Sequence, residues 1–232
     1  MTQEFRGRAS STRVAQAEHG VAIARSGQIA ELVALEQLGM RRSFTRDEEI
    51  YAEGDASDCW FKVVSGTVRI CKLMADGRRH IAAFHFSGDY FGLDIGTARS
   101  FSAEAVGDAV VMLMPRRATQ RLIDTTPELA CQLRDLVMRD FAHAQSRMLL
   151  LGRMTAPERV ARFLVEVAER RDSWRTLDLP MSRADIADYL GLTIETVCRV
   201  LSAFKRAGVI VIPSPHRIEL RDRDMLSELC EA

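Results

Sequence analysis

The chain has 232 residues and carries 32 basic and 32 acidic side chains, so its formal net charge is zero. Hydrophobic residues make up 47% and charged residues 28%, a composition typical of a globular protein with one large domain or two small ones. The charge balance excludes a strongly basic histone-like binder and an acidic tail protein, but it allows a nucleic-acid binder whose charge is arranged locally.

Signals for membranes, secretion and disulfides are missing. No stretch approaches 18 uninterrupted apolar residues, and residues 1–13 contain no apolar signal region. The five cysteines are scattered and odd in number, so we expect a cytoplasmic protein with reduced thiols and no metal site. Of the 32 basic residues 29 are arginine, a bias that a GC-rich genome explains as easily as phosphate binding does.

The N-terminal half is predicted to be a polar extension followed by a β-domain. Residues 1–27 lack periodicity, which predicts a flexible extension, and a short helical pattern follows over 29–38. From Arg41 to Met114, β-rich runs alternate with glycine-containing turns at regular intervals of 11 or 12 residues. This spacing predicts an antiparallel sandwich or barrel, with a hairpin at Asp76-Gly77, in a sensor-like domain over residues 28–125.

A short helix over 117–123 is predicted next, and then a long helix that begins at Thr126-Pro127-Glu128, with Thr as cap and Pro in the first turn. Its apolar residues recur every three or four positions, which predicts a dimerisation helix over 126–153. The expected dimer seam consists of Leu133, Val137, Phe141, Ala144, Met148 and Leu151. About 26 helical residues span about 39 Å, more than a small domain needs internally. A core helix that packs on the sheet remains an alternative interpretation of the same stripe.

The C-terminal part, assigned to residues 154–232, is predicted to begin with a helix from Thr155 to about Arg171. A polar break to Leu179, two short helices and a β-rich end follow. The end is expected to form a hairpin with strands over 209–212 and 217–220, joined by a turn over 213–216. Such a wing is either a phosphate contact or a lid on the core.

The two short helices form a helix-turn-helix pattern. Ser182 followed three residues later by Asp185 resembles a capping box, with Asp in place of Glu or Gln. Gly191 ends the first helix at a position suited to positive φ, and Thr193 caps the second. Two short helices joined by a tight glycine-containing turn are typical of DNA-binding proteins, whose second helix enters the major groove.

The start of the second helix carries exposed polar groups that suit base contacts. Glu can accept a hydrogen bond from cytosine N4, and Arg can donate two to guanine O6 and N7. Glu195 and Arg199 are four residues apart and share one face. The alternative is a surface ion pair between these two side chains.

The chain resembles the CRP/FNR superfamily of bacterial transcription regulators from about residue 28 to 226. The resemblance rests on Arg183, Asp185-Ile186-Ala187, Leu190-Gly191, Glu195-Thr196-Val197 and Arg199, and on Gly66 and Gly88-Asp89-Tyr90-Phe91-Gly92. It implies an α+β fold with an N-terminal antiparallel β-roll like a cyclic-nucleotide-binding domain, a long dimerisation helix and a C-terminal winged helix-turn-helix. It also implies a homodimer that binds double-stranded DNA and contacts RNA polymerase, and no enzyme.

Departures from the family pattern indicate the FixK-type branch, without a cofactor. Leu93 follows Gly92, where the cyclic-AMP branch has Glu, and the best alignment puts Ser100-Phe101 at the phosphate-binding pair. An offset clamp from Arg99-Ser100 stays open. No cysteine precedes Cys59, so the ligands of an FNR-type iron–sulfur cluster are absent.

The resemblance also suggests the DNA sequence. Ile194 stands where the cyclic-AMP branch has an Arg that precedes the Glu, and Ile can contact a thymine methyl but cannot recognise guanine. We therefore expect base contacts from Ile194, Glu195 and Arg199 with a palindrome resembling TTGA-N6-TCAA. Phosphate contacts are expected from Ser182, Arg183, Thr193, Thr196, Cys198, Lys205 and His216.

Regulation has three interpretations. The protein acts without an effector, a small molecule in the β-roll gates it, or oxidation of Cys198 weakens DNA binding. A sulfinate at Cys198 would place negative charge beside the DNA phosphates. A half-buried thiol that only packs within the motif is the alternative for Cys198.

Overall fold

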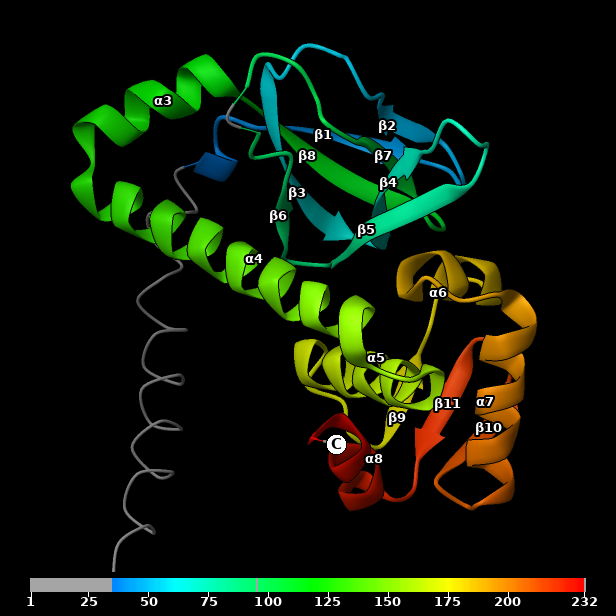
Figure 1. Cartoon of the computed structure of the whole chain (residues 1–232). Coiled ribbons are helices and arrows are strands. Elements are labelled where there is room, and N and C mark those ends of the chain that lie inside the picture. Colours follow the sequence, from blue (N-terminus) through cyan, green and yellow to red (C-terminus); the bar gives the residue numbers. More distant parts are fainter. Residues whose placement is uncertain (1–34, 95, 232) are drawn as a thin grey trace, which may run out of the picture.

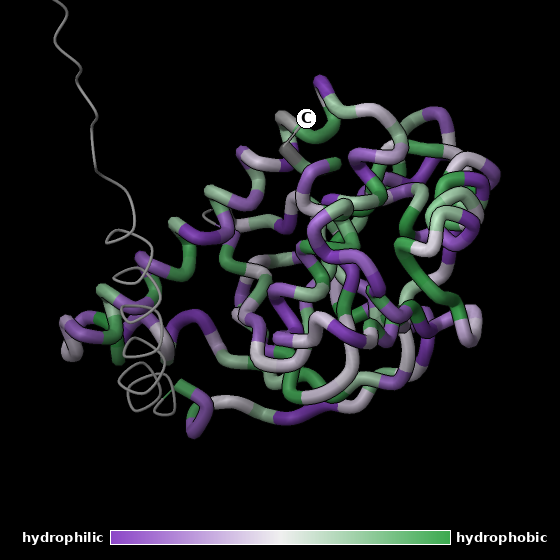
Figure 2. Tube along the Cα trace, turned by 90° about the horizontal axis from the view of Figure 1, so that it is seen from below, coloured by the Kyte–Doolittle hydropathy of each residue, from purple (hydrophilic) through white to green (hydrophobic). Residues whose placement is uncertain are grey.

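The computed structural model describes residues 35–94 and 96–231, and the elements run from a β-roll through one long helix to a C-terminal unit (Figure 1). The expected extension over 1–27 and most of the expected helix over 29–38 lie outside the described residues. In this part of the chain no helix combines the length and the apolar character needed to cross a membrane. Hydrophobic and hydrophilic residues alternate over short distances along the chain (Figure 2).

The β-roll (residues 40–115) consists of two four-stranded antiparallel sheets. The first has the order β1-β8-β3-β6, with β1 Met40–Phe44, β8 Ala109–Pro115, β3 Cys59–Ser65 and β6 Tyr90–Phe91. The second has the order β2-β7-β4-β5, with β2 Glu49–Tyr51, β7 Ser102–Ala105, β4 Thr67–Leu73 and β5 Arg79–Phe86. Alternate side chains of both sheets, among them Val63, Val68 and Val111, meet in a buried core. The predicted antiparallel β-roll is confirmed.

One tight turn of the β-roll depends on glycine. Gly66, between β3 and β4, has φ +88°, and a Cβ there would lie 2.5 Å from the backbone oxygen of Asp108. No other residue fits this crossing of two chain segments without a backbone shift.

The helix α3 (Arg116–Thr125) leads into α4 (Pro127–Arg153), which passes along the β-roll and reaches the C-terminal unit (Figure 1). Its first turns are buried on the β-roll through Leu129 and Leu133, and its last turn contributes Leu150 to the core of the C-terminal unit. Between these ends Phe141 is 57% and Met148 is 75% exposed. The helix therefore packs on the β-roll at its start and leaves an apolar face uncovered along its middle.

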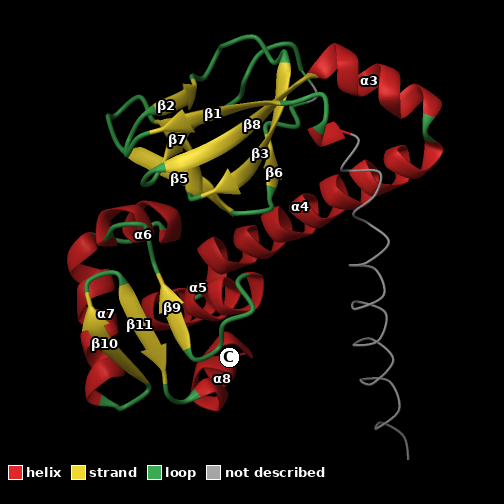
Figure 3. Ribbon diagram, turned by 180° about the vertical axis from the view of Figure 1, so that it is seen from behind, coloured by secondary structure: helices red, strands yellow, loops and turns green. Residues whose placement is uncertain are grey.

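The C-terminal unit (residues 156–231) surrounds a three-stranded sheet, shown with its helices in Figure 3. Its helices are α5 Ala156–Arg170, α6 Arg183–Leu190, α7 Ile194–Arg206 and α8 Arg223–Glu231. Its strands, in the order β10-β11-β9, are β10 Ile210–Ser214, β11 Arg217–Leu220 and β9 Thr176–Asp178. The two short helices and the β11 strand occur where the sequence predicts them.

Three details of the C-terminal prediction are wrong. The polar break over 171–179 contains β9, a three-residue strand that exists because it pairs with β11 across the fold. The strand predicted over 209–212 continues through Ser214, so the turn of the wing is shorter than expected. The chain ends in a helix rather than in strands, because Leu226 of α8 is buried in the core of this unit.

Candidate nucleic-acid interface

The first helix of the motif, α6, begins at the predicted capping box. The Ser182 hydroxyl accepts from the Asp185 amide at 3.1 Å and donates to Asp185 Oδ2 at 2.8 Å, and the Ser182 amide donates to the same Oδ2 at 2.9 Å. Gly191 ends α6 with φ +62°, the left-handed conformation that the sequence predicted. The Leu192 amide then closes the turn onto the Ala187 carbonyl at 3.0 Å.

The second helix, α7, is capped by Thr193, whose hydroxyl accepts from the Thr196 amide at 3.3 Å. One face is buried and comprises Val197, Val200, Leu201 and Phe204. The opposite face is exposed and comprises Ile194, Glu195, Cys198, Arg199, Ser202, Lys205 and Arg206. The helical repeat thus leaves one polar face of α7 free along its whole length.

The three expected base contacts lie together on the first turns of this exposed face. Ile194 is 46% exposed, and Glu195 and Arg199 lie one turn apart. Arg199 Nη2 donates to the Thr196 hydroxyl at 3.2 Å, and within the described residues no ion pair joins it to Glu195. Hydrogen bonds from its own backbone amide and from Thr193 lower the pKa of Glu195, which keeps it an acceptor. The guanidinium and the carboxylate are therefore both available for a ligand.

Five of the seven expected phosphate contacts are engaged within the chain: Thr193 and Thr196 bond each other at the start of α7, and Ser182, Arg183 and His216 have partners outside that helix. The Ser182 hydroxyl proton is directed to Asp185, Arg183 donates to the Pro215 carbonyl at 3.1 Å, and His216 Nδ1 lies 3.0 Å from the Leu179 carbonyl oxygen. Arg183 and His216 thus connect the wing to α6 and to the segment after β9. Thr193, Thr196, Cys198 and Lys205 lie on α7 or at its cap.

The arginine that could clamp a cyclic phosphate in the β-roll, Arg99, is engaged within the chain. The Arg99 side chain is 1% exposed, pairs with Asp94 at 2.8 Å and donates to the Gly92 carbonyl at 2.7 Å. Its guanidinium also stacks over the rings of Tyr51 and Phe61 at 4.4 and 5.2 Å. An arginine held in this way is not free to bind a phosphate, so these residues do not fit a cyclic nucleotide.

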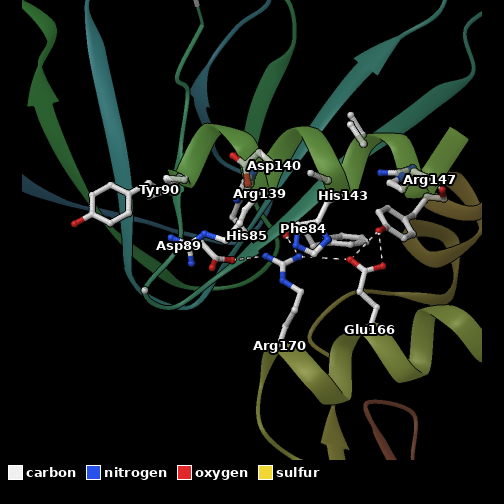
Figure 4. A pocket seen from close by; sticks show the side chains of 16 residues that line it. Phe84, His85, Asp89, Tyr90, Arg139, Asp140, His143, Arg147, Glu166 and Arg170 are labelled. Atoms are coloured by element: carbon white, nitrogen blue, oxygen red, sulfur yellow. Dashed lines mark hydrogen bonds and ion pairs between the residues drawn. The ribbon is translucent and has the colours of Figure 1, made fainter. Parts of the chain in front are cut away.

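A hollow with a volume of about 500 Å³ lies between β5, α4 and α5 (Figure 4). Arg170 crosses it, pairs with Asp89 at 2.5 Å and donates to the Phe84 carbonyl at 2.9 Å. The Tyr189 hydroxyl donates to Glu166 at 3.1 Å on the same side. The Arg170 contacts attach the C-terminal unit to the β-roll across the hollow, whereas the bond between Tyr189 and Glu166 joins α6 to α5 within the C-terminal unit.

The residues that join α6 to the β-roll could not be recognised from the sequence. Arg69 and Arg79, on β4 and β5, reach Asp185 from more than 100 residues away in the sequence. The only local signal was the unusual Asp at the third position of the capping box.

Comparison with known proteins matches both parts of the chain. Residues 158–229 match the Crp-like helix-turn-helix domain, and residues 41–126 match the cyclic nucleotide-binding domain. The Nitrogen fixation regulation protein FixK of Azorhizobium caulinodans is 43% identical over 224 residues, which cover 94% of this chain and 90% of that protein. The Transcriptional activatory protein AadR of Rhodopseudomonas palustris is 37% identical over 200 residues, 84% of each.

Among solved structures, FixK2 from Bradyrhizobium japonicum is similar with a TM-score of 0.81 and 42% identity, over 84% of this chain and 98% of that one.

Proposed function

This chain belongs to the CRP/FNR family and is a FixK/FNR-type transcription regulator with a helix-turn-helix DNA-binding domain; from this premise we propose that it is a homodimeric activator that binds a palindrome resembling TTGA-N6-TCAA without an effector in the β-roll. The observation that carries the proposal is the exposed face of α7, where Ile194, Glu195 and Arg199 lie together and unpaired with one another.

These three side chains match the chemistry of the proposed half-site. Arg199 donates two hydrogen bonds to guanine, Glu195 accepts one from the cytosine amine, and Ile194 contacts a thymine methyl. Arg183 connects the wing to α6, and His216 connects it to the segment after β9. We expect the wing to contact the DNA backbone, which orients the protein without specifying sequence.

The homodimer rests on α4. Leu133 is buried on the β-roll and Leu151 packs against the core of the C-terminal unit, so the exposed part of the expected seam consists of Val137, Phe141, Ala144 and Met148. A two-fold contact through this face would present two copies of α7 to half-sites about one helical turn apart.

Selection of bound sites from a random duplex library tests the DNA sequence. We expect TTGA and TCAA half-sites separated by six base pairs, and enrichment of TGTGA would contradict the proposal. Footprinting on a promoter that carries the selected site, with and without RNA polymerase, tests activation through a contact with the polymerase.

The engaged Arg99 supports the proposal that the protein acts without a cyclic nucleotide in the β-roll. Calorimetry with cyclic AMP should show no heat of binding, and DNA affinity should be the same with and without the nucleotide. The alternative, a β-roll gated by a small molecule, requires Arg99 to leave Asp94, and saturable heat with any cyclic nucleotide would favour it.

We also propose that oxidation of Cys198 weakens DNA binding. The thiol is exposed on the DNA-facing side of α7, and a negative charge at Cys198 would raise the pKa of Arg183. A sulfinate formed there would attract Arg183 and repel phosphate. Peroxide should lower the DNA affinity of the wild type and leave the DNA affinity of Cys198→Ser unchanged. Equal losses of affinity in both proteins would show that oxidation of Cys198 is not the cause.

A further inference from the structure

The Asp185 carboxylate serves two parts of the molecule at once. Its Oδ2 oxygen accepts both hydrogen bonds from Ser182 and thereby caps α6. Its Oδ1 oxygen faces away from the helix and accepts from Arg79 at 2.5 Å and from Arg69 at 3.3 Å. The start of the first motif helix is therefore joined to the β-roll through a single side chain.

The β-roll side of this junction is anchored in turn. Arg69 on β4 also pairs with Glu104 at 2.6 Å and with Asp47 at 2.9 Å. Arg79 at the start of β5 also pairs with Asp188, one turn further along α6, at 2.9 Å. Two arginines from one sheet thus hold two acidic residues of one helix.

The junction is largely removed from water. The side chains of Arg69 and Asp185 are each 7% exposed. Burial raises the pKa of Asp185, but the Ser182 hydrogen bonds and the charges of Arg69 and Arg79 outweigh it, so the pKa lies below its usual value. Loss of one partner would leave the other charges buried without compensation, which is costly.

A second attachment on the other side of the C-terminal unit restricts rotation about the first. There Arg170 binds Asp89, and Arg147 of α4 donates to the carbonyls of Ile81 and Tyr189 at 3.1 and 2.9 Å (Figure 4). Two separate points of attachment prevent sliding and allow turning only about the line that joins them, and the short connection from α4 to α5 restricts that rotation. The helix α7, packed on α6, therefore has a defined direction relative to α4.

We propose that Arg69 and Arg79 are positioning residues for DNA recognition: through Asp185 and Asp188 they fix the orientation of the helix-turn-helix relative to the dimer helix, and hence the spacing between the two half-sites that the dimer accepts. The spacing part of this inference rests on the proposed homodimer, whereas the fixed orientation of α6 within one chain does not.

Two variants test the junction without removing the cap. In Asp185→Asn the side-chain oxygen still accepts from Ser182, but the charge that faces the arginines is lost. Arg79→Gln removes the contacts to Asp185 and Asp188 from the β-roll side. Arg78→Gln is the matched control, since Arg78 precedes Arg79 in the same hairpin and its side chain, among the residues that the structure describes, pairs only with Asp76 in the turn, at 2.7 Å.

Two readouts are measured on the full chain. The first is affinity for palindromes with spacers of five, six and seven base pairs, and the second is amide hydrogen exchange. We expect Asp185→Asn and Arg79→Gln to lose about tenfold in affinity for the preferred spacer and little for the others, so that the preference collapses. Amides of α6 and β5 should exchange about tenfold faster, while those of β3 and β8 keep their rates.

The outcomes distinguish the orientation of α6 within one chain from the half-site spacing that the dimer accepts. Equal loss at all three spacers, or unchanged exchange in α6 and β5, would overturn the positioning role. A wild-type protein without any spacer preference would overturn the proposed dimeric recognition and the spacing part of the inference, while hydrogen exchange would still decide whether the junction orients α6. Arg78→Gln should match the wild type in both readouts.

Discussion

At the scale of single residues, Arg199 and Arg206 lie on the same exposed side of α7 but differ in what they can recognise. Arg199 follows the first turn, which enters the major groove in helix-turn-helix proteins, whereas Arg206 is the last residue of the helix. We expect Arg199→Ala to weaken binding to a TTGA-N6-TCAA duplex by about 1–3 kcal/mol. Arg206→Ala should weaken binding to specific and scrambled duplexes alike. Fluorescence anisotropy on both duplexes measures the difference.

An equal loss of affinity for both duplexes in Arg199→Ala would show that Arg199 does not contact a base.

The sequence could predict the position of Arg199 because the helix-turn-helix pattern fixes it relative to the cap at Thr193. It could not predict that Arg199 donates to Thr196 rather than to Glu195, since that depends on the rotamers of exposed side chains.

A histidine in the β-roll makes stability sensitive to acid. Burial lowers the pKa of His85 to about 4, and its ring stacks on Phe91. As the pH falls from about 6.5 towards 4, the unfolded chain binds a proton that the folded chain excludes, so stability falls. We expect a loss on the order of 2 kcal/mol across this window.

Thermal unfolding at pH 7.5 and pH 5 measures this loss. His85→Phe should retain the ring stacking and lose part of the acid sensitivity, whereas the exposed His143→Gln should keep the wild-type difference. The same acid sensitivity in His85→Phe would assign the loss to other groups.

At the scale of elements, two glycines with positive φ differ in the space around them. A Cβ on Gly191 would lie 3.5 Å from its nearest neighbour, Leu151 Cδ2, whereas a Cβ on Gly66 would lie 2.5 Å from a backbone oxygen. We expect Gly191→Ala to cost about 1–2 kcal/mol, from the left-handed backbone alone. Gly66→Ala should cost more, because strands must move apart. Urea unfolding measures the free energy of unfolding of both variants, and equal losses would contradict the difference expected from the space around the two glycines.

The elements that the sequence predicts well have strong local signals. The start of α5 follows from its capping sequence, and the Glu158 carboxylate accepts from the Thr155 amide at 2.8 Å. The Asp76-Gly77 turn follows from its dipeptide. By contrast β9 and β7 have only three and four residues, too few for a hydrophobic repeat to stand out, and they form by pairing, β9 with β11 and β7 with β4 and β2. The contacts of Asp185 with β4 and β5 are equally non-local, so sequence spacing contains no trace of them.

At the scale of the whole molecule, the exposed middle of α4 determines the oligomeric state that we propose. Charged substitutions at Phe141 and Met148 would place unpaired charge in the two-fold contact. We expect Phe141→Glu/Met148→Glu to sediment as a monomer near 26.0 kDa and to lose preference for a palindrome over a single half-site. Leu73→Glu is the control, because Leu73 is equally apolar and 68% exposed but lies on the β4–β5 hairpin.

Analytical ultracentrifugation measures the oligomeric state, and a dimer that persists with both substitutions would place the dimer contact elsewhere.

The sequence predicted the apolar stripe of α4 but could not tell which of its residues pack within the chain and which are exposed for a dimer contact. Leu133 and Leu151 turn out to pack within the chain, because the β-roll and the C-terminal unit cover the two ends of the helix.

The junction between the β-roll and the C-terminal unit is built on guanidinium groups, and this choice has a chemical consequence. Acetylation neutralises a lysine ammonium group but leaves arginine unchanged. The chain has three lysines: Lys62 and Lys72 pair with Glu36 and Glu53 outside this junction, and Lys205 is exposed on α7. A lysine acetyltransferase acting on this protein therefore has no target in the junction that orients α6. It would change DNA affinity through the charge of Lys205 and leave the selected half-site spacing as it is.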